Sequence, residues 1–305
     1  MYSIKDKPKD FIVDEVINLN LDGGKYVYFK LKKENFTTIK ALELIARRLN
    51  LKLKNFGFAG NKDKKAITTQ ACSVFGANED KLKDLKLSNI KIEILGRGKS
   101  PISLGDLEGN SFKIFVKAEK IKKTDFFVNY YGEQRFGINC NNHIIGKYLL
   151  ERRFKQACNN LNLSKINPIN SLREFGARKL KFFLHSYQSY LWNSLIYEKL
   201  KEEDGFEVPY CLGKYKFLDK KIKNFKVNLP NFDTDDYNHI LKKENLVKEA
   251  FLIRELPELV SETNFRDIIT EVKDLKVKKE KEGYFLSFFL NKGSYATVFL
   301  KKLFF

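Results

Sequence analysis

Hydrophobic and polar residues alternate in the N-terminal part of the chain, as they do in half-buried β-strands. The alternation covers Tyr26–Lys32 and returns over Ser111–Lys117. Between these segments a helical spacing begins after a capping residue, Thr37 or Thr38, and runs to about Leu49. The pattern therefore predicts sheet strands with a helix between them in the sequence, which is a mixed organisation.

The pattern changes in the middle of the chain. Helical spacing dominates over about His143–Ala157 and again over Arg178–Leu200. The segment 205–245 is rich in Asp, Asn and Lys, has weak periodicity, and carries Pro209 and Pro230, which we place at turns. We therefore expect a second, more helical module.

The composition adds a strong positive charge to this picture. The 305 residues include 57 Lys and Arg against 38 Asp and Glu, which gives a formal charge of +19 and a pI of about 9.5. This charge suits contact with a phosphate backbone, because such contact releases condensed counterions. Charge alone does not separate RNA from DNA or from an anionic membrane, and a lysine-rich proteome or adaptation to heat would also raise it.

No segment predicts export or insertion into a membrane. The N-terminal residues are charged, and the longest apolar run, near Tyr284–Leu290, is too short to span a bilayer. The cysteines are scattered without a CxxC pair, and the histidines do not cluster with them at metal-ligand spacing. We therefore expect reduced core thiols, a cytosolic setting and no metal, while a Cys/His site assembled by the fold stays open. The residues concerned are Cys72, Cys140, Cys158, Cys211, His143, His185 and His239.

One loop carries candidate chemistry. It reads GFAGNKDKKAITTQ over Gly57–Gln70 and is followed by a predicted strand, Ala71–Phe75. Asp63 is the only carboxylate of this loop and has lysines on both sides. Three ammonium groups adjacent in sequence favour the charged form of a carboxylate, so Asp63 is a candidate nucleophile. The alternative is a solvated hairpin whose charges face water. The three lysines are Lys62, Lys64 and Lys65.

This loop resembles the signature of the TruD family of tRNA pseudouridine synthases, in which the pattern A-G-x-K-D-(K/R)-x-A-x-T-x-Q carries the catalytic aspartate. The matching residues are Ala59, Gly60, Lys62, Asp63, Lys64, Ala66, Thr68 and Gln70. Four further stretches resemble the family's other motifs and occur in the family's order. They are KDKPKDFIVDE at Lys5–Glu15, LGDLEGNSF at Leu104–Phe112, NYYGEQRFG at Asn129–Gly137 and GSYAT at Gly293–Thr297. A chance match in one lysine-rich loop does not explain this agreement along nearly the whole chain.

The resemblance implies an α+β fold, in which a mixed-sheet pseudouridine synthase domain is interrupted by a smaller, more helical insertion. On this chain we expect the catalytic domain over 1–147 and 267–305, and the insertion over 148–266. The insertion is short by the standards of the family.

The resemblance also implies the reaction and the roles of residues. Uridine becomes pseudouridine when the N1 to C1′ bond breaks and a C5 to C1′ bond forms, with no net redox change and no donated group, so no cofactor is required. Asp63 is the implied nucleophile. Lys5 is the cation that would orient Asp63 and keep it ionised, and Tyr131, where the family usually has Phe, would stack on the flipped base.

The remaining candidates would contact the substrate or support the loop. Asn129 resembles the family residue that binds the uracil or holds the aspartate in place. Arg135, Lys62 and Lys64 are candidates for phosphate contact or for scaffolding, and Gln70 belongs to the same RNA-binding set through the loop motif. Sequence leaves open whether Asp63 attacks C1′, attacks C6 or assists a glycal route.

The expected substrate is tRNA, with uridine 13 of the D arm as target by resemblance, and the expected location is the cytoplasm. No membrane and no obligate protein partner is inferred. A non-catalytic basic RNA-binding protein or RNA chaperone would also explain the charge and the aromatic residues, but it gives no reason for Asp63. A nuclease would need several carboxylates around a metal, and no such cluster accompanies the motifs.

Overall fold

The computed structural model describes residues 2–260 and 263–305. The chain forms two compact units, each described below by itself. Unit 1 consists of residues 1–125, 271–296 and 303–305, and unit 2 of residues 126–270 and 297–302. These limits differ from the domain limits expected from the sequence, 147/148 and 266/267. The two compact units do not show which residues form a catalytic domain and which form an insertion, so that division stays a prediction.

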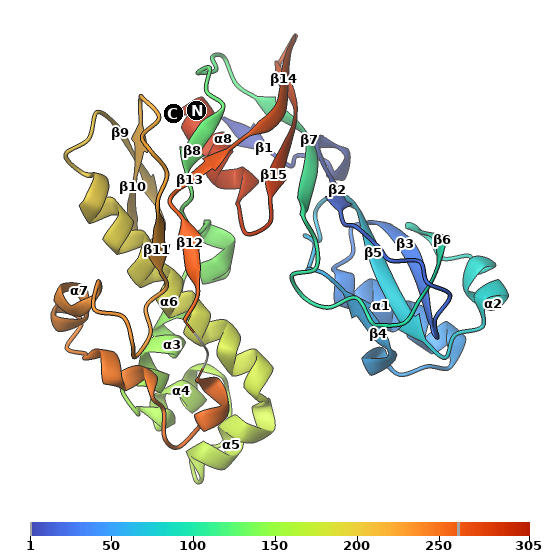
Figure 1. Ribbon diagram of the computed structural model, residues 1–305, viewed down its shortest axis with the longest axis horizontal. Helices are drawn as coiled ribbons and strands as arrows, with labels where there is room; N and C mark the ends of the chain where they lie inside the picture. Colours follow the sequence, from blue (N-terminus) through green and yellow to red (C-terminus); the bar gives the residue numbers. More distant parts are fainter. Residues whose placement is uncertain (1, 261–262) are drawn as a thin grey trace. The chain divides into compact units, whose positions relative to one another are not determined.

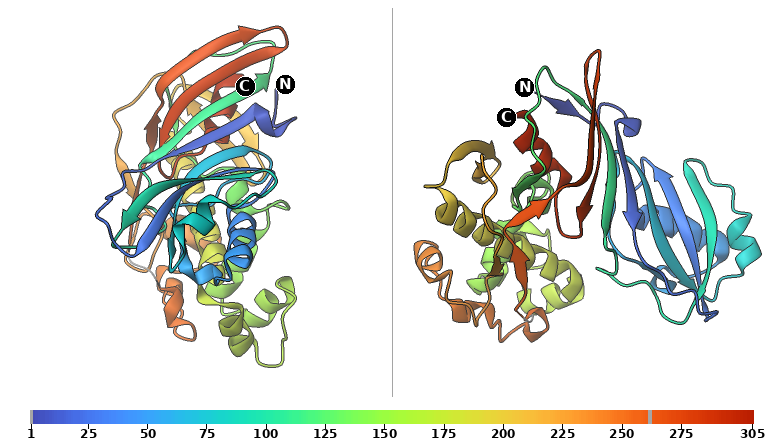
Figure 2. Two further views of the ribbon diagram at one scale, coloured as in Figure 1. Left: turned by 90° about the vertical axis from the view of Figure 1, so that its right-hand side faces the viewer. Right: turned by 45° about the horizontal axis from the view of Figure 1, so that its top comes forward.

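Unit 1 is built on one large sheet, with the strand order β14-β15-β7-β2-β5-β3-β6, in which β1 also pairs with β7 and β4 with β5 (Figure 1). The pair β2 and β5 is parallel and the other pairs are antiparallel, so the sheet is mixed, as expected. Figure 2 shows these strands side by side, from the red β14 and β15 to the blue-green β6. The strands are β1 (Ser3–Ile4), β2 (Phe11–Val16), β3 (Tyr26–Glu34), β4 (Phe56–Phe58), β5 (Ile67–Phe75), β6 (Ile90–Gly98), β7 (Gly109–Lys117), β14 (Lys273–Glu280) and β15 (Gly283–Asn291).

Helix α1 (Thr38–Leu49) lies along one face of this sheet (Figure 1). Its cap is Thr37, whose Oγ1 accepts a hydrogen bond from the Lys40 amide at 3.2 Å. The apolar face of α1 is buried against the inward residues of β3, and each such side chain contributes about 1.5–3 kcal/mol. This confirms the predicted helix and the alternation along β3. Unit 1 also contains α2 (Glu79–Lys83) and 3-10 turns at Pro8–Asp10 and Leu53–Asn55.

Strand β5 begins four residues earlier than the sequence pattern indicated. Its first residues pair in parallel with β2, where Ile12 faces Ile67 and Asp14 faces Thr69. Thr68 and Thr69 are β-branched and fit this pairing, but they lack the apolar character on which the prediction relied. The loop around Asp63 is therefore confined to the residues between Phe58 and Ile67.

Unit 2 is organised around the 24-residue helix α6 (Ala177–Leu200), which confirms the more helical second module. Helix α3 packs closely on α6 at Gly146, where a Cβ atom would come 2.3 Å from the carbonyl oxygen of Phe183. In the described part of the chain, no helix is long and apolar enough to cross a membrane. The helices are α3 (Asn142–Leu150), α4 (Phe154–Asn160), α5 (Pro168–Phe175), α6, α7 (Asn238–Lys243) and residues 297–302 of α8 (Ala296–Phe304), with 3-10 turns at Glu133–Phe136, Lys248–Phe251 and Pro257–Leu259. The strands are β8 (Phe126–Val128), β9 (Gly205–Tyr210), β10 (Gly213–Leu218), β11 (Lys226–Asn228), β12 (Phe265–Asp267) and β13 (Ile269–Glu271).

Two local expectations in unit 2 are wrong. The helical segment expected over His143–Ala157 is interrupted, because Arg152 adopts a left-handed backbone with φ of 56° and separates α3 from α4. Pro209 lies within β9, opposite Lys214 of β10, rather than at a turn. A two-stranded sheet has an outward edge on each strand, where the missing amide hydrogen of proline is tolerated.

The expectation of four reduced core thiols is also wrong. Cys140 and Cys211 form a disulfide within unit 2, and Cys72 and Cys158 are free and buried. Cys211 lies between β9 and β10, while Cys140 follows the 3-10 turn Glu133–Phe136. The two cysteines are 71 positions apart, so their spacing gives no sign of the bond. The cytosolic setting therefore loses the support that the cysteines gave it.

Candidate active site

Asp63 lies in the loop between β4 and β5, and its carboxylate forms an ion pair with the ammonium group of Lys5. The Asp63 side chain keeps 39% of its surface exposed and that of Lys5 19%, so the pair is accessible to a ligand. Lys5 has φ of 61°, a left-handed backbone that is uncommon outside glycine and concentrates at functional sites. Its ammonium group also lies 4.0 Å from the centre of the Phe11 ring. The fold thus joins two residues that the motifs selected 58 positions apart.

A second ion pair lies beneath the same loop, between Lys62 and Glu15. Here the exposed fractions are 7% and 0%, so both charges are removed from solvent. The other carboxylate oxygen of Glu15 accepts a hydrogen bond from the Ala71 amide of β5 at 3.2 Å. Since its ammonium group is engaged inside the protein, the structure supports the scaffold interpretation of Lys62 over phosphate contact.

Lys33 supports the loop from below and was missed by sequence reasoning. Its Nζ donates to the carbonyl oxygens of Phe36, Asp63 and Lys62 at 2.6, 3.1 and 3.4 Å. Burial is the main cause that lowers the pKa of Lys33 to about 8, and the Asp63 charge opposes this shift. The sequence did contain a signal for this role. Lys33 continues the series of alternate residues Val27, Phe29 and Leu31, whose side chains face the core from β3.

Thr38 and Gln70 fix the other end of the loop. Thr38 Oγ1 donates to Gln70 Oε1 at 2.7 Å and accepts a hydrogen bond from the Lys62 amide at 2.9 Å. Gln70 Nε2 donates to the Gly60 carbonyl oxygen at 3.0 Å. Gln70 is 1% exposed and both ends of its amide are used within the chain. The observed contacts give Gln70 a structural part, and its role in RNA binding stays a prediction.

The lysines adjacent to Asp63 in sequence are not its ion-pair partners in space. Lys62 pairs with Glu15, Lys64 and Lys65 are exposed, and the pairing cation comes from Lys5. A loop sends consecutive side chains in different directions, so the sequence neighbours of Asp63 need not contact its carboxylate. Lys64 stays available for phosphate contact.

Tyr131, in unit 2, is anchored through its main chain. Asn193 of α6 accepts a hydrogen bond from the Tyr131 amide at 2.9 Å and donates one to its carbonyl oxygen at 3.0 Å. The Tyr215 hydroxyl donates to the same carbonyl oxygen at 2.9 Å. Because these contacts use the backbone, they fix the position of Tyr131 whatever ring it carries.

The ring of Tyr131 lies against cations and a second ring. The Arg266 guanidinium carbon is 4.1 Å from the ring centre and that of Arg135 is 5.6 Å. Trp192 of α6 meets the ring edge to face, with centres 5.7 Å apart. Arg266 was missed, since it lies in none of the motifs and no hydrophobic pattern marked it. A base that stacked on Tyr131 would enter a site of positive charge.

Asn129 is held by the same arginine. Arg266 Nε donates to the Asn129 carbonyl oxygen at 2.8 Å, and its Nη2 donates to Asn129 Oδ1 at 2.7 Å. The Asn129 Nδ2 donates to the Asp267 carbonyl oxygen at 3.0 Å. Arg266 thus contacts two of the three candidates from the NYYGEQRFG motif, Asn129 and Tyr131, and the predicted roles of both stay predictions.

A cavity of about 330 Å³ adjoins Tyr131 and is lined mainly by polar side chains. Arg135 lines it, and within the described residues its buried Nε has no hydrogen-bond partner. His185 lines it as well, and burial, aided by Arg135 and Lys181, lowers the pKa of its imidazole to about 4. His185 is therefore neutral near pH 7, where it can both donate and accept a hydrogen bond.

Comparison with known proteins identifies relatives of this chain. The profile of the family "tRNA pseudouridine synthase D (TruD)" matches residues 2–167 and 225–303. A "Probable tRNA pseudouridine synthase D" of Nanoarchaeum equitans is 29% identical over 376 aligned positions, which cover 99% of this chain and 98% of that protein. The "tRNA pseudouridine synthase D" of Aquifex aeolicus is 28% identical over 386 positions, covering 99% and 97%. Both alignments are longer than this chain of 305 residues, so each relative has segments that this chain lacks.

A solved structure shares the fold. The crystal structure of the putative tRNA pseudouridine synthase D (TruD) from Methanosarcina mazei superposes with a TM-score of 0.66 at 23% identity, covering 99% of this chain and 93% of that one. Together with the family profile, which spans most of the chain, this fold defines a pseudouridine synthase, an isomerase. The chain belongs to the TruD family of tRNA pseudouridine synthases.

Proposed function

We propose that this protein converts uridine 13 in the D arm of tRNA to pseudouridine, with Asp63 as the nucleophile. The observation that carries the proposal is the pair of Asp63 and Lys5, an accessible carboxylate matched to a cation from the N-terminal motif. The Lys5 ammonium contacts the carboxylate directly, so it would orient Asp63 as a nucleophile. The substrate and the target position come from the family rather than from any contact in this structure.

The proposed reaction balances within the substrate. The N1 to C1′ bond of uridine breaks and a C5 to C1′ bond forms. The proton on C5 leaves to water, and N1 takes up a proton, so the composition of the substrate is unchanged. Attack of Asp63 on C1′, attack on C6 and a glycal route all give this balance. Lys5 would orient the carboxylate, while Lys33, Lys62 and Thr38 would keep its loop in place through the contacts described above.

Tyr131 would stack on the base that leaves the helix, and such stacking offsets the few kcal/mol that flipping costs. Asn129 would bind the uracil or maintain the geometry of the site. We further propose that residues 148–266 form the insertion of the family and that 1–147 with 267–305 form its catalytic domain. A tRNA substrate also implies a cytoplasmic protein.

Tritium release from tRNA transcripts labelled at uracil C5 tests the reaction, because only a change at C5 frees the label. Wild type should release tritium and Asp63→Asn should not, while Asp63→Asn keeps its affinity for tRNA. Primer extension after carbodiimide treatment should then map the product to position 13. Release mapped elsewhere would discard that position but keep the enzyme.

The same assay separates the non-catalytic alternative. A basic RNA-binding protein or RNA chaperone would bind tRNA tightly, release no tritium from any tRNA, and be unchanged by Asp63→Asn.

A further inference from the structure

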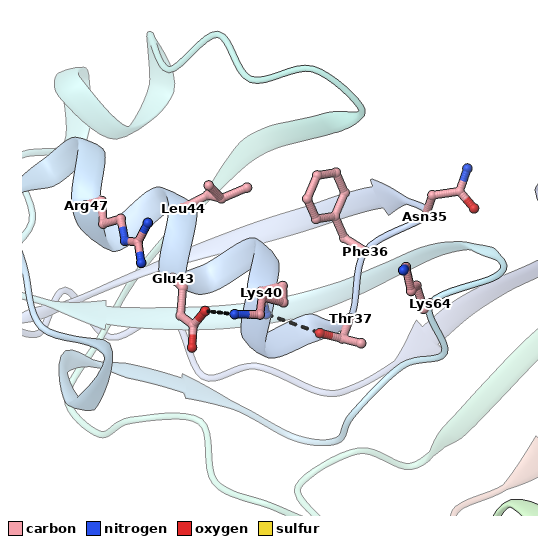
Figure 3. A pocket seen from close by; sticks show the side chains of 8 residues that line it. All are labelled: Asn35, Phe36, Thr37, Lys40, Glu43, Leu44, Arg47 and Lys64. Carbon is pink, nitrogen blue, oxygen red and sulfur yellow. Dashed lines mark hydrogen bonds and ion pairs between the residues drawn. The ribbon is translucent and has the colours of Figure 1, made fainter. Parts of the chain in front are cut away.

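A pocket of about 510 Å³ lies beside the Asp63 loop, within unit 1. Its walls are the turn that enters α1, one side of that helix, and Lys64 of the loop. Figure 3 shows the Phe36 ring between Leu44 on one side and Lys64 on the other. We name it the Phe36 pocket, and its lining includes Phe36, Lys40, Glu43, Leu44, Arg47 and Lys64.

The Phe36 pocket carries an excess of positive charge. Three cations line it, and its one carboxylate, Glu43, is already engaged by Lys40 at 2.9 Å. Arg47 and Lys64 are exposed, and neither is paired with a carboxylate of the described residues. An occupant that complements this wall has to be an anion.

The Phe36 pocket also offers a flat apolar surface. Phe36 and Leu44 pack on the core beneath α1 while part of each stays accessible. Asn35, with φ of 59°, makes the left-handed turn that presents Phe36, and Asn tolerates this backbone better than most residues. An aromatic face next to arginine and lysine is the combination that binds a nucleotide, whose base stacks while its phosphate meets the cations.

The position of the pocket links it to the reactive carboxylate. Lys64 follows Asp63 directly, so their Cα atoms are about 3.8 Å apart. Lys33 binds the carbonyl oxygens of both Phe36 and Asp63, and so ties the pocket wall to the loop. A polynucleotide that brings one residue to Asp63 therefore has its neighbouring nucleotides within reach of the pocket.

We propose that the Phe36 pocket binds a nucleotide of the substrate tRNA close to the reacting uridine. Its base stacks on Phe36 and Leu44, and its phosphate contacts Arg47 and Lys64. This inference rests on the proposed function for the identity of the RNA. The proposed nucleotide site includes residues of α1, which none of the family motifs contains.

Arg47 and Arg48 provide a matched test, because they are consecutive, exposed and chemically identical, and only Arg47 lines the pocket. We would measure tRNA binding by filter retention at several salt concentrations, with each change made in full-length Asp63→Asn protein so that no turnover occurs. Arg47→Glu should weaken binding about tenfold and lower the slope of log K against log salt by about one. Arg48→Glu should change both much less. Equal effects of the two changes would overturn the proposal.

Phe36→Leu tests the stacking half of the site. It keeps an apolar side chain in the core, and thermal unfolding would verify that the protein is folded. Affinity should fall about fivefold or more with the salt slope unchanged, since no charge is removed. Unchanged affinity in a folded Phe36→Leu protein would contradict base stacking, and it would leave an anion site for a different partner, such as an acidic protein segment.

Failure of this inference can be told apart from failure of the proposed function. Tritium release by wild type tests the reaction alone, whereas binding in the Asp63→Asn protein tests the pocket alone. If wild type released no tritium but Arg47→Glu still weakened tRNA binding selectively, the pocket would stand and the proposed reaction would fall.

Discussion

Different forces maintain the Asp63 site in unit 1 and the Tyr131 site in unit 2. Around Asp63, two lysine-carboxylate pairs and the Lys33 ammonium fix a loop through charge. Around Tyr131, main-chain hydrogen bonds and packed rings fix a buried side chain, with arginine over its face. A reactive carboxylate needs a strong field and access, while a stacking platform needs rigidity, and each site has the support that its proposed task requires.

The two ion pairs of the Asp63 loop differ in how exposed they are to solvent. The pair of Asp63 with Lys5 is accessible, so it adds little to the stability of the fold. The pair of Lys62 with Glu15 is buried, so loss of either partner would leave an uncompensated charge. We infer that the accessible pair serves the reaction and the buried pair serves the scaffold, and their variants should separate the two roles.

Among the residues that support Asp63, Lys5 should matter most for the reaction, and Lys5→Met tests this. Removal of the cation beside the nucleophile should lower kcat by about 10²- to 10³-fold, the range seen when one electrostatic contact of an active site is deleted. The free energy of unfolding should change by less than about 1 kcal/mol, because water can solvate the exposed Asp63 carboxylate. Single-turnover tritium release and urea unfolding would measure the two effects. A stability loss as large as the loss in activity would place Lys5 in the scaffold instead.

Lys62→Met should have the largest effect on stability. It would leave Glu15 buried without its partner, which costs about 3–5 kcal/mol. Lys64→Met is the matched control, since Lys64 is exposed two positions away and its removal should cost less than about 0.5 kcal/mol. Urea unfolding of both variants would test this difference. Equal stability of the two proteins would show that the buried pair contributes nothing net.

The sequence predicted the parts of the Asp63 site that lie in continuous motifs. Helix α1 with its cap and the alternation of β3 were placed from local pattern, whereas the roles of the Asp63 loop and Lys5 came from the resemblance to the TruD motifs. Lys33 was overlooked because the predicted strand ended at Lys32 and none of the motifs includes Lys33. Its role depends on three carbonyl groups that only the folded loop brings together.

The Tyr131 site shows the opposite limit of sequence reasoning. Asn129 and Tyr131 were found because they lie in one motif, but Arg266 is 135 positions beyond Tyr131 in a segment without clear periodicity. The disulfide between Cys140 and Cys211 escaped for the same reason. Contacts between distant segments are fixed by the topology, and a single sequence carries no record of which distant residues meet.

Lys33 should make stability depend on pH. Its pKa is about 8 in the folded protein against an ordinary value of 10.5, so between these values the unfolded chain binds more protons than the folded one. Stability therefore rises with pH across this window, by up to about 3 kcal/mol from this group. Lys33→Met lacks the contribution, so the free energy of unfolding of wild type minus that of the variant should increase between about pH 7 and about pH 10. A constant difference would show that Lys33 titrates normally.

Tyr131→Ala should disturb the other site by removing the stacking platform. Loss of stacking on a base costs about 1–3 kcal/mol, which corresponds to a fall in kcat/KM of about five- to 150-fold. Truncation also leaves a cavity against Trp192 and Arg266, so thermal unfolding should accompany the assay. Normal turnover by Tyr131→Ala would refute the stacking role.

Tyr131→Phe should have the smallest effect, and it tests whether the ring or the hydroxyl matters. The contacts from Asn193 and Tyr215 reach the main chain of residue 131, and those from Arg266 and Trp192 reach its ring, so all of them survive the change. We expect kcat/KM within about threefold of wild type. A loss comparable to that of Tyr131→Ala would mean that the hydroxyl takes part in binding or reaction. The Tyr131 site would then depend on a polar contact of the hydroxyl as well as on the packing of the ring. In that case the Tyr131 site and the Asp63 site would differ less than their contacts indicate.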